Sequence, residues 1–267
     1  RPIPGPAVPL IAAPTTAGTG TEVTKNAVLT CEAEQFKASM RSLHLVARVA
    51  LVDPSLTDSA PPEVTASTGL DALTQLIEPC VCTRANPVTD ALAVRGIHLV
   101  ARSLRRAFQD GDDARARDDM ALAALLSGIC LANAGLGAVH GFAAPLGAAF
   151  PVPHGAACAA LLPHVMRANV AALREQDPQG PGLRRYAEAG EAWLGRREAS
   201  DAKTIDASVA SVAELVCDLG VPGLSSYGLG EDAIPELVAR ARRSSSMRAN
   251  PVMLPDEALA DCLRSAL

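Results

Sequence analysis

Three histidines lie in a long segment of this sequence that has no charged side chains. Between Met120 and Met166 there is no Asp, Glu, Lys or Arg, but the segment contains His140, His154 and His164. A buried imidazole needs a partner for each ring nitrogen. Because His140 and His154 are both flanked by glycine in this uncharged segment, they suggest a shared ligand such as a metal ion. Two separate structural histidines are the alternative. His164 is a candidate third participant, for which a helix-cap role is the simpler interpretation.

Two other segments carry residue types that could contribute to a site. Asp71 and Gln75 are four residues apart in a predicted helix, so both emerge on one face and could share a metal ion. An Asp favoured by a helix N-terminus beside a solvated Gln is the alternative. Segment 15–22 is rich in Thr and Gly and follows a predicted strand. Small residues there let backbone N–H groups and hydroxyls approach a phosphate or ribose, although such a segment can also be an ordinary turn.

These candidates must be positioned by two kinds of structure. Val8–Ala13 and Val49–Val52 are short apolar runs that predict buried strands of an α/β layer, and Ala27–Thr30 predicts another short strand. From Glu63 onward the apolar residues recur at helical spacing, which predicts a helical bundle. Turn-forming clusters predict helix breaks at 86–87, 109–113, 151–155, 177–182 and 220–223. We therefore expect an α/β remnant over residues 1–60 and an all-helical domain over 61–267.

Composition limits the class of protein. Hydrophobic residues make up 49% of the 267 residues and aromatic residues only 3%, so the core must be built from Ala, Val and Leu. The net charge is −5 and no basic stripe follows the chain, which argues against a nucleic-acid partner. Seven cysteines without zinc-finger spacing favour a reducing, cytoplasmic location, and Cys80 and Cys82 are interpreted as small core residues.

The uncharged segment also raises the question of a membrane span. It is interrupted by Asn133 and by prolines, and no aromatic belt flanks it, so we interpret it as buried core rather than as a membrane helix. The chain begins at Arg1 with a Pro-rich stretch that lacks the apolar core of a signal peptide. We expect it to be a fragment.

Several motifs, in this order and spacing, resemble the iron-containing (group III) alcohol dehydrogenase family. They are Pro14-Thr-Thr-Ala-Gly-Thr-Gly-Thr-Glu22, Gly69-Leu-Asp-Ala-Leu73, Asn86-Pro87 with Thr89-Asp-Ala91, Gly137-Ala-Val-His-Gly141, Pro153-His-Gly155, Leu162-Pro-His164 and Asn250-Pro251. The resemblance extends from about residue 8 to the C-terminus. It implies a dehydroquinate synthase-like fold, in which a nucleotide-binding α/β domain and an all-helical domain enclose a cleft for NAD or NADP and a divalent metal, Fe²⁺ or Zn²⁺.

The resemblance also implies roles for particular residues. Asp71, His140 and His154 match metal ligands at the family's catalytic centre, and Gln75 stands where the best-known members place a fourth ligand, a histidine. The implied cofactor-binding residues are Thr15, Thr16, Gly18, Thr19, Gly20, Thr21 and Lys37. The expected activity is metal-dependent hydride transfer between the nicotinamide and a small alcohol or aldehyde, in a homo-oligomer, as a dimer. Neither the substrate nor the choice between NAD and NADP follows from the sequence.

The sequence departs from the family pattern in three ways. An amide oxygen at Gln75 is a weaker donor than imidazole. Ala144 replaces a histidine that several members carry near the cofactor, so a proton relay through that side chain is absent. The family's first βαβ units, with their Gly-rich pyrophosphate loop, are not in this chain. Two alternatives therefore stay open: a metal-independent enzyme similar to maleylacetate reductases, and a non-catalytic truncated subunit or pseudoenzyme.

Overall fold

The structure is a computed structural model that describes residues 3, 5, 7–31 and 36–267, and the side chains at 30–38 lie outside the described part. Its strands are β1 (Ile11–Ala12), β2 (Asn26–Cys31), β3 (Phe36–Arg41) and β4 (Val49–Ala50). Its α-helices are α1 (Pro62–Val81), α2 (Pro87–Gln109), α3 (Ala114–Asn133), α4 (Ala138–Ala149), α5 (His154–Gln176), α6 (Pro181–Leu194), α7 (Asp201–Asp218), α8 (Ile234–Arg242) and α9 (Asp256–Ser265).

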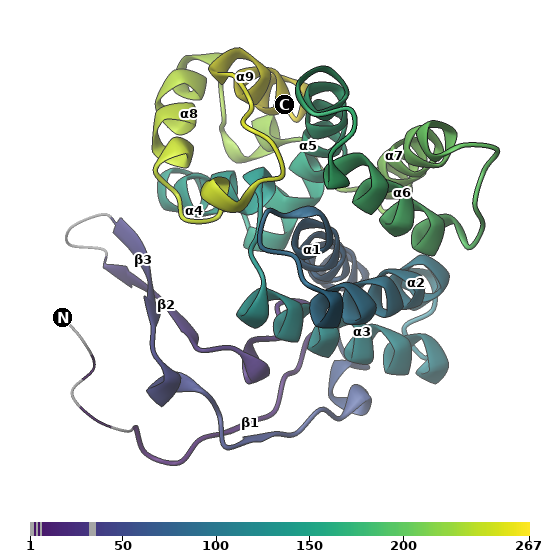
Figure 1. The fold of residues 1–267 in the computed structure, drawn as a ribbon. Helices are drawn as coiled ribbons and strands as arrows, with labels where there is room; N and C mark the ends of the chain where they lie inside the picture. Colours follow the sequence, from purple (N-terminus) through teal and green to yellow (C-terminus); the bar gives the residue numbers. More distant parts are fainter. Residues whose placement is uncertain (1–2, 4, 6, 32–35) are drawn as a thin grey trace.

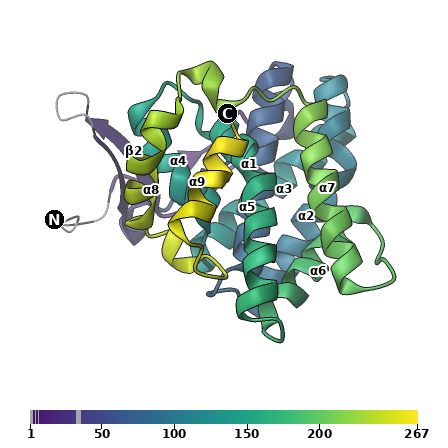
Figure 2. The ribbon, with the colours of Figure 1, turned by 90° about the horizontal axis from the view of Figure 1, so that it is seen from above.

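Helix α1 lies at the centre of the helical part, where α2, α3 and α5 pack against it (Figure 1). Helices α6 and α7 continue the bundle on one side, and α4, α8 and α9 form its other end, as the view from above shows (Figure 2). The core is made mainly of Ala, Leu and Val side chains, among them the fully buried Leu70, Leu73 and Leu76 of α1. The predicted helical bundle is thus confirmed, and each predicted break falls between two helices or at the end of one.

The strands at the N-terminal end lie apart from most of the bundle (Figure 1). β1 pairs in parallel with β4, with Ile11 opposite Val49, and β2 pairs antiparallel with β3, with Asn26 opposite Arg41. The predicted burial of Val8–Ala13 and Val49–Val52 is wrong, since Val8 is 84% and Ile11 66% exposed. Each of these strands has a single partner within the described residues, so its apolar side chains meet solvent.

The proposed division into domains near residue 60 stays a prediction; the first α-helix begins at Pro62. Helix α5 is long and apolar enough to cross a membrane, and so are α3 and α4 taken together as one bent pair. In α5, however, 78% of the apolar window is buried inside the protein, as is usual for the core helix of a folded domain.

Candidate metal centre and cofactor cleft

One face of α1 carries three polar side chains in an otherwise apolar, buried stretch. Asp71, Gln75 and Glu78 follow one another at spacings of four and three residues, so they emerge on the same side of the helix. Their exposed fractions are 2%, 2% and 5%. Burying a carboxylate is unfavourable unless it is paired or binds a cation. We therefore expect donors or a cation beside this face of the helix.

Helices α4 and α5 bring those partners from a distant part of the sequence. His140 lies in the first turn of α4, and His154 is the first residue of α5. Cys158 follows His154 by four residues and therefore shares its face of α5. Helix α5 packs closely on α1, because a Cβ atom at Gly155 would overlap the backbone of Ser67.

The four side chains form one compact cluster. The possible ligand atoms of Asp71, His140, His154 and Cys158 all lie within 4.8 Å of one another. Asp71 Oδ1 is 3.4 Å from His140 Nε2 and 3.7 Å from His154 Nε2. Cys158 Sγ is 3.9 Å and 3.8 Å from the same two nitrogens. Two imidazoles, a carboxylate and a thiol at one point are a donor set suited to a divalent transition metal.

Glu78 determines which nitrogen of His140 faces this cluster. Its Oε2 atom lies 2.6 Å from His140 Nδ1, and its Oε1 accepts the backbone N–H of Val139 at 2.8 Å. The carboxylate therefore favours the tautomer with the proton on Nδ1, which leaves the lone pair of Nε2 directed at Asp71 and Cys158. A histidine held by a carboxylate in this way is the usual arrangement around protein-bound metals.

A buried hydrogen-bond network fixes the start of α4. Asn250 Oδ1 accepts the backbone N–H of Ala138 at 3.0 Å, and its amide nitrogen donates to Asn169 Oδ1 at 2.6 Å. Asn169 in turn donates to the Tyr186 hydroxyl at 3.1 Å. Together with Glu78 this network satisfies N–H groups that the first turn of a helix leaves without partners, and it positions His140.

The cluster has a field that favours positive charge. Burial alone would lower the pKa of His140, but Cys158, Glu78 and Asp71 raise it well above its usual value. Cys158 raises the pKa of His154 against the effect of burial, and Asp71 adds to the increase. Burial would raise the pKa of Asp71, but His140 and His154 hold it below its usual value. In the absence of a metal, the cluster therefore favours protonated histidines beside an ionised Asp71.

Two buried oxygens in this region have no hydrogen-bond partner among the side chains and backbone that the structure describes. They are Asp71 Oδ1 and Gln75 Oε1, while the Gln75 amide nitrogen donates to Asp71 Oδ2 at 3.1 Å. Buried acceptors are rarely left in this state unless an ion or water is missing. The residues present therefore fit a divalent cation.

The Thr- and Gly-rich segment 15–22 lies against α3 next to this centre. Gly20 has φ +56° and packs so closely on Gly128 of α3 that a Cβ atom at either glycine would overlap the other's backbone. Ser127 donates to the Gly18 carbonyl at 3.3 Å. These contacts need glycine and hold the segment in place, which leaves the Thr19 and Thr21 side chains exposed.

A cavity of about 420 Å³ connects the segment with the centre. Thr19 and Thr21 line it together with Gln75, His140 and His154. The side chain of His154 is 38% exposed, so the centre is open to this space. The cavity wall is otherwise largely apolar, with Ala27, Val28, Leu131, Leu136 and Ala144 among its residues. Such a cavity can accept a small organic molecule with one polar end at the cluster.

Family models match nearly the whole chain. The model described as Fe-containing alcohol dehydrogenase family, C-terminal, matches residues 65–267, and the model described as iron-containing alcohol dehydrogenase matches residues 1–54. The chain belongs to the iron-containing alcohol dehydrogenase family. The fold class expected from the sequence motifs is therefore confirmed.

Individual members of the family are similar along most of the chain. A 1,3-propanediol dehydrogenase of Citrobacter freundii is 37% identical over 265 residues, which is 98% of this chain and 66% of that protein. The solved structure of a 1,3-propanediol oxidoreductase superposes with a TM-score of 0.91 at 35% identity and covers 99% of this chain and 68% of the solved one. A sulfoacetaldehyde reductase from Bifidobacterium kashiwanohense, solved in complex with NAD⁺, gives a TM-score of 0.83 at 32% identity over 97% of this chain and 64% of its own. The chain thus spans about two thirds of the length of these family members.

The residues that the family resemblance assigns to the site lie only partly together. Asp71, His140 and His154 lie together, and Gln75 lies beside Asp71; their roles as metal ligands stay a prediction. Thr19 and Thr21 reach the same cavity, Gly18 and Gly20 pack against helices, and Thr15 and Thr16 are exposed outside the cavity wall. The side chain of Lys37 lies outside the described part.

Three site features differ from the sequence analysis or were missed by it. The helix-cap role expected for His164 is wrong, because this residue lies in the middle of α5 and lines a separate cavity with Arg167. Glu78 was missed, although its spacing from Asp71 and Gln75 on one helix face was a usable signal. Cys158 was also missed, because the cysteines have no zinc-finger spacing; its spacing of four from His154 was the available signal.

Proposed function

We propose that the protein of which this chain is part or whole is a metal-dependent NAD(P)-linked alcohol dehydrogenase or aldehyde reductase. The observation that carries the proposal is the cluster of Asp71, His140, His154 and Cys158, open to an apolar cavity that the Thr-rich segment also lines. Family membership supports the same activity. We place the enzyme in the cytoplasm, as a homodimer, with a small alcohol or aldehyde as its substrate.

When bound, a divalent cation such as Fe²⁺ or Zn²⁺ supplies Lewis-acid polarisation of the substrate oxygen, and NAD or NADP accepts or supplies the hydride. The residues of the chain hold and orient these groups. Glu78 keeps the proton of His140 on Nδ1, and Gln75 donates to Asp71 Oδ2, so that the other carboxylate oxygen and the two imidazoles face the cation. Thr19 and Thr21 offer hydroxyls to the cofactor, while Leu131 and Leu136 exclude water from the apolar cavity.

Cys158 completes the proposed donor set. Its sulfur lies 3.9 Å and 3.8 Å from the two imidazole nitrogens, compared with 3.4 Å and 3.7 Å for Asp71 Oδ1. Gln75 already donates its amide nitrogen to Asp71. Cys158 would hold a cation as a thiolate, and a thiolate ligand favours Zn²⁺ over harder metals. The amide oxygen of Gln75 then acts as a neighbour of Asp71 rather than as the fourth donor.

The activity is tested by metal analysis of the purified protein, by fluorescence titration with NADH and NADPH, and by turnover of short alcohols and aldehydes. We expect bound metal, binding of one reduced cofactor, and turnover that is lost with the metal and restored by adding it back. Turnover that survives complete metal removal would identify a metal-independent reductase. Failure to bind either cofactor would favour a non-catalytic subunit.

The donor set is tested by titration with Co²⁺. Thiolate ligation gives a sulfur-to-cobalt charge-transfer band in the near ultraviolet, which we expect in the wild type and not in Cys158→Ser. Cys130→Ser is the matched control, because Cys130 is also buried but lies outside the cluster. A band that persists in Cys158→Ser excludes this thiolate as a ligand and leaves Gln75 as the candidate donor.

A further inference from the structure

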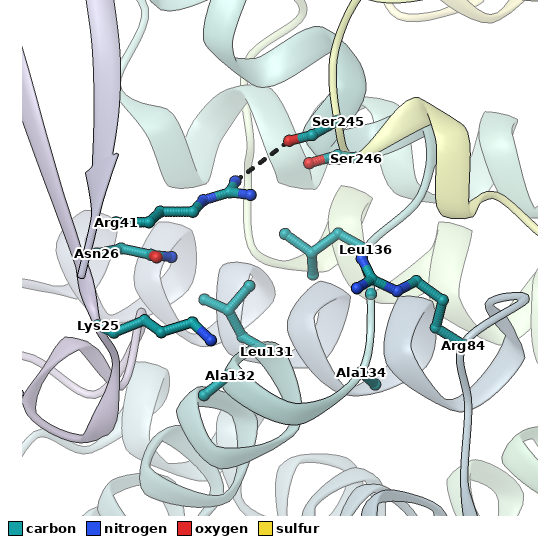
Figure 3. A pocket seen from close by; sticks show the side chains of 11 residues that line it. Lys25, Asn26, Arg41, Arg84, Leu131, Ala132, Ala134, Leu136, Ser245 and Ser246 are labelled. Atoms are coloured by element: carbon teal, nitrogen blue, oxygen red, sulfur yellow. Dashed lines mark hydrogen bonds between the residues drawn. The ribbon is translucent and has the colours of Figure 1, made fainter. Parts of the chain in front are cut away.

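Three cationic side chains line a second cavity of about 230 Å³, which adjoins the first. Lys25 comes from the turn before β2, Arg41 from the end of β3, and Arg84 from the turn after α1. In Figure 3, Lys25 and Arg41 enter from one side and Arg84 from the other, with their charged ends around Leu131 and Leu136. The open end of the β2–β3 hairpin, which carries Lys25 and Arg41, and the turn after α1 therefore bring positive charge to one hollow.

These cations are not used in ion pairs with carboxylates that the structure describes. Several arginines on the helices do have such partners, as in Arg102 with Asp119 and Arg105 with Asp218. Arg41 instead donates to the Ser245 hydroxyl at 3.2 Å, which keeps its guanidinium over the hollow (Figure 3). Because the chain as a whole carries a net charge of −5, this concentration of positive charge is a local feature. Guanidinium and ammonium groups gathered in this way are suited to an oxyanion.

The two cavities share part of their walls. Asn26, Arg41, Leu131, Leu136 and Ser246 line both of them. One end of the combined space is lined by His140 and His154, and the other by the three cations. A molecule whose reacting oxygen lies at the cluster therefore extends over the two leucines toward Arg41.

We propose that the substrate carries an oxyanion group, so that the enzyme interconverts a short hydroxy acid and the corresponding oxo acid. The apolar wall at Leu131 and Leu136 takes the carbon chain, and Lys25, Arg41 and Arg84 take a carboxylate, sulfonate or phosphate at its far end. This inference rests on the proposed function, because it places the reacting oxygen at the metal centre. It adds the chemical class of the substrate, which the motifs of the sequence do not specify.

A matched pair of probes tests the proposal by turnover. 4-Oxobutanoate and butanal have the same chain length and differ in a terminal carboxylate. We expect kcat/KM to favour 4-oxobutanoate, and we expect this preference to fall about tenfold in Arg41→Gln and in Arg84→Gln, as for loss of one charge-assisted contact. Arg95→Gln is the control, because Arg95 is exposed on α2 and its substitution removes the same charge at a position away from the cavity.

A binding experiment separates this proposal from the proposed function. Succinate titrated into the metal-loaded protein by calorimetry should bind more weakly to Arg41→Gln than to the wild type, whether or not the protein turns over. If no carbonyl is reduced but succinate binding depends on Arg41, the proposed function fails and the oxyanion site remains. If aldehydes are reduced with no preference for 4-oxobutanoate, the oxyanion proposal is overturned. It is also overturned if the two arginine variants weaken the binding of NADPH instead, since the cations would then serve a cofactor phosphate.

Discussion

Replacing Glu78 with glutamine exchanges one carboxylate oxygen for an NH₂ group next to the candidate metal centre. This exchange should reverse the tautomer of His140. The Glu78 carboxylate accepts two hydrogen bonds, from the Val139 backbone N–H at 2.8 Å and from His140 Nδ1 at 2.6 Å. A glutamine side chain has one acceptor oxygen and one NH₂ group. Because the Val139 N–H can only donate, the amide oxygen must face it, and the NH₂ group then faces His140. His140 can accept that bond only with its proton moved to Nε2, where a metal ligand needs its lone pair.

The expected size of the effect follows from this conflict. Loss of an outer hydrogen bond to a ligating histidine weakens metal binding by about 10- to 100-fold. That range corresponds to about 1.4 to 2.7 kcal/mol. Since Glu78 is 5% exposed and its contact with His140 is short and charge-assisted, we expect the upper end, about 100-fold.

The measurement is a Zn²⁺ competition titration against a chromophoric chelator, with circular dichroism of the metal-free protein to check folding. Glu63→Gln is the matched control, because Glu63 lies on the same helix but is exposed. We expect Glu63→Gln to bind Zn²⁺ like the wild type. A folded Glu78→Gln variant with wild-type affinity would refute the assignment of the His140 tautomer and of Nε2 as a ligand.

Three further outcomes are expected. Gly195→Ala should lower the free energy of unfolding by about 1 kcal/mol, because its φ is positive. Gly20→Ala should lower it by about 1–3 kcal/mol more, because its Cβ atom also meets the α3 backbone. Urea unfolding measures both losses, and equal losses would contradict the close packing at Gly20. Burial raises the pKa of the Cys80 and Cys130 thiols to about 12 from 9.0. The two neutral thiols therefore contribute fully to the free energy of unfolding below pH 9, and this contribution should be lost between pH 9 and 12, where the thiols of the unfolded chain ionise first. Coincident unfolding titrations at pH 8 and pH 10 would contradict this expectation. Asn250→Ala leaves a buried N–H of α4 without an acceptor and should lower the free energy of unfolding by about 1–3 kcal/mol, and an unchanged melting temperature would contradict this.

The helical part of the fold could be predicted from the sequence because its signals are local. Apolar spacing in residues such as Leu70, Leu73 and Leu76 predicts a buried helix face, and Pro or Gly clusters mark the breaks. The strands were predicted less well. β1 and β4 have two residues each, and the hydrophobic runs around them are exposed, since burial depends on which element covers a strand rather than on its composition.

The candidate site shows a similar division. The Asp71, His140 and His154 motifs could be found by family resemblance, and the structure brings these residues together. Glu78 could not be assigned from the motifs, because its role depends on where α4 begins relative to α1. The oxyanion cavity could not be predicted from the sequence, because the β2–β3 pairing that joins Lys25 to Arg41 and the packing that brings Arg84 to them are visible only in the structure.

The polar face of α1 carries buried side chains that the candidate site uses and that folding alone does not need. An apolar helix with the same packing would fold without burying Asp71, Gln75 and Glu78, and the site's partners satisfy these groups only in part. Both oxygens of Glu78 accept hydrogen bonds, but within the described part of the chain Asp71 Oδ1 and Gln75 Oε1 have none. The same surroundings raise the pKa of both neighbouring histidines. Local violations of packing rules in natural proteins are concentrated at functional sites. A divalent cation would bind the carboxylate oxygen and replace the protons that the histidines otherwise attract. Because burying these polar groups is unfavourable for folding, their presence on α1 is the physical argument that the chain holds such a cation.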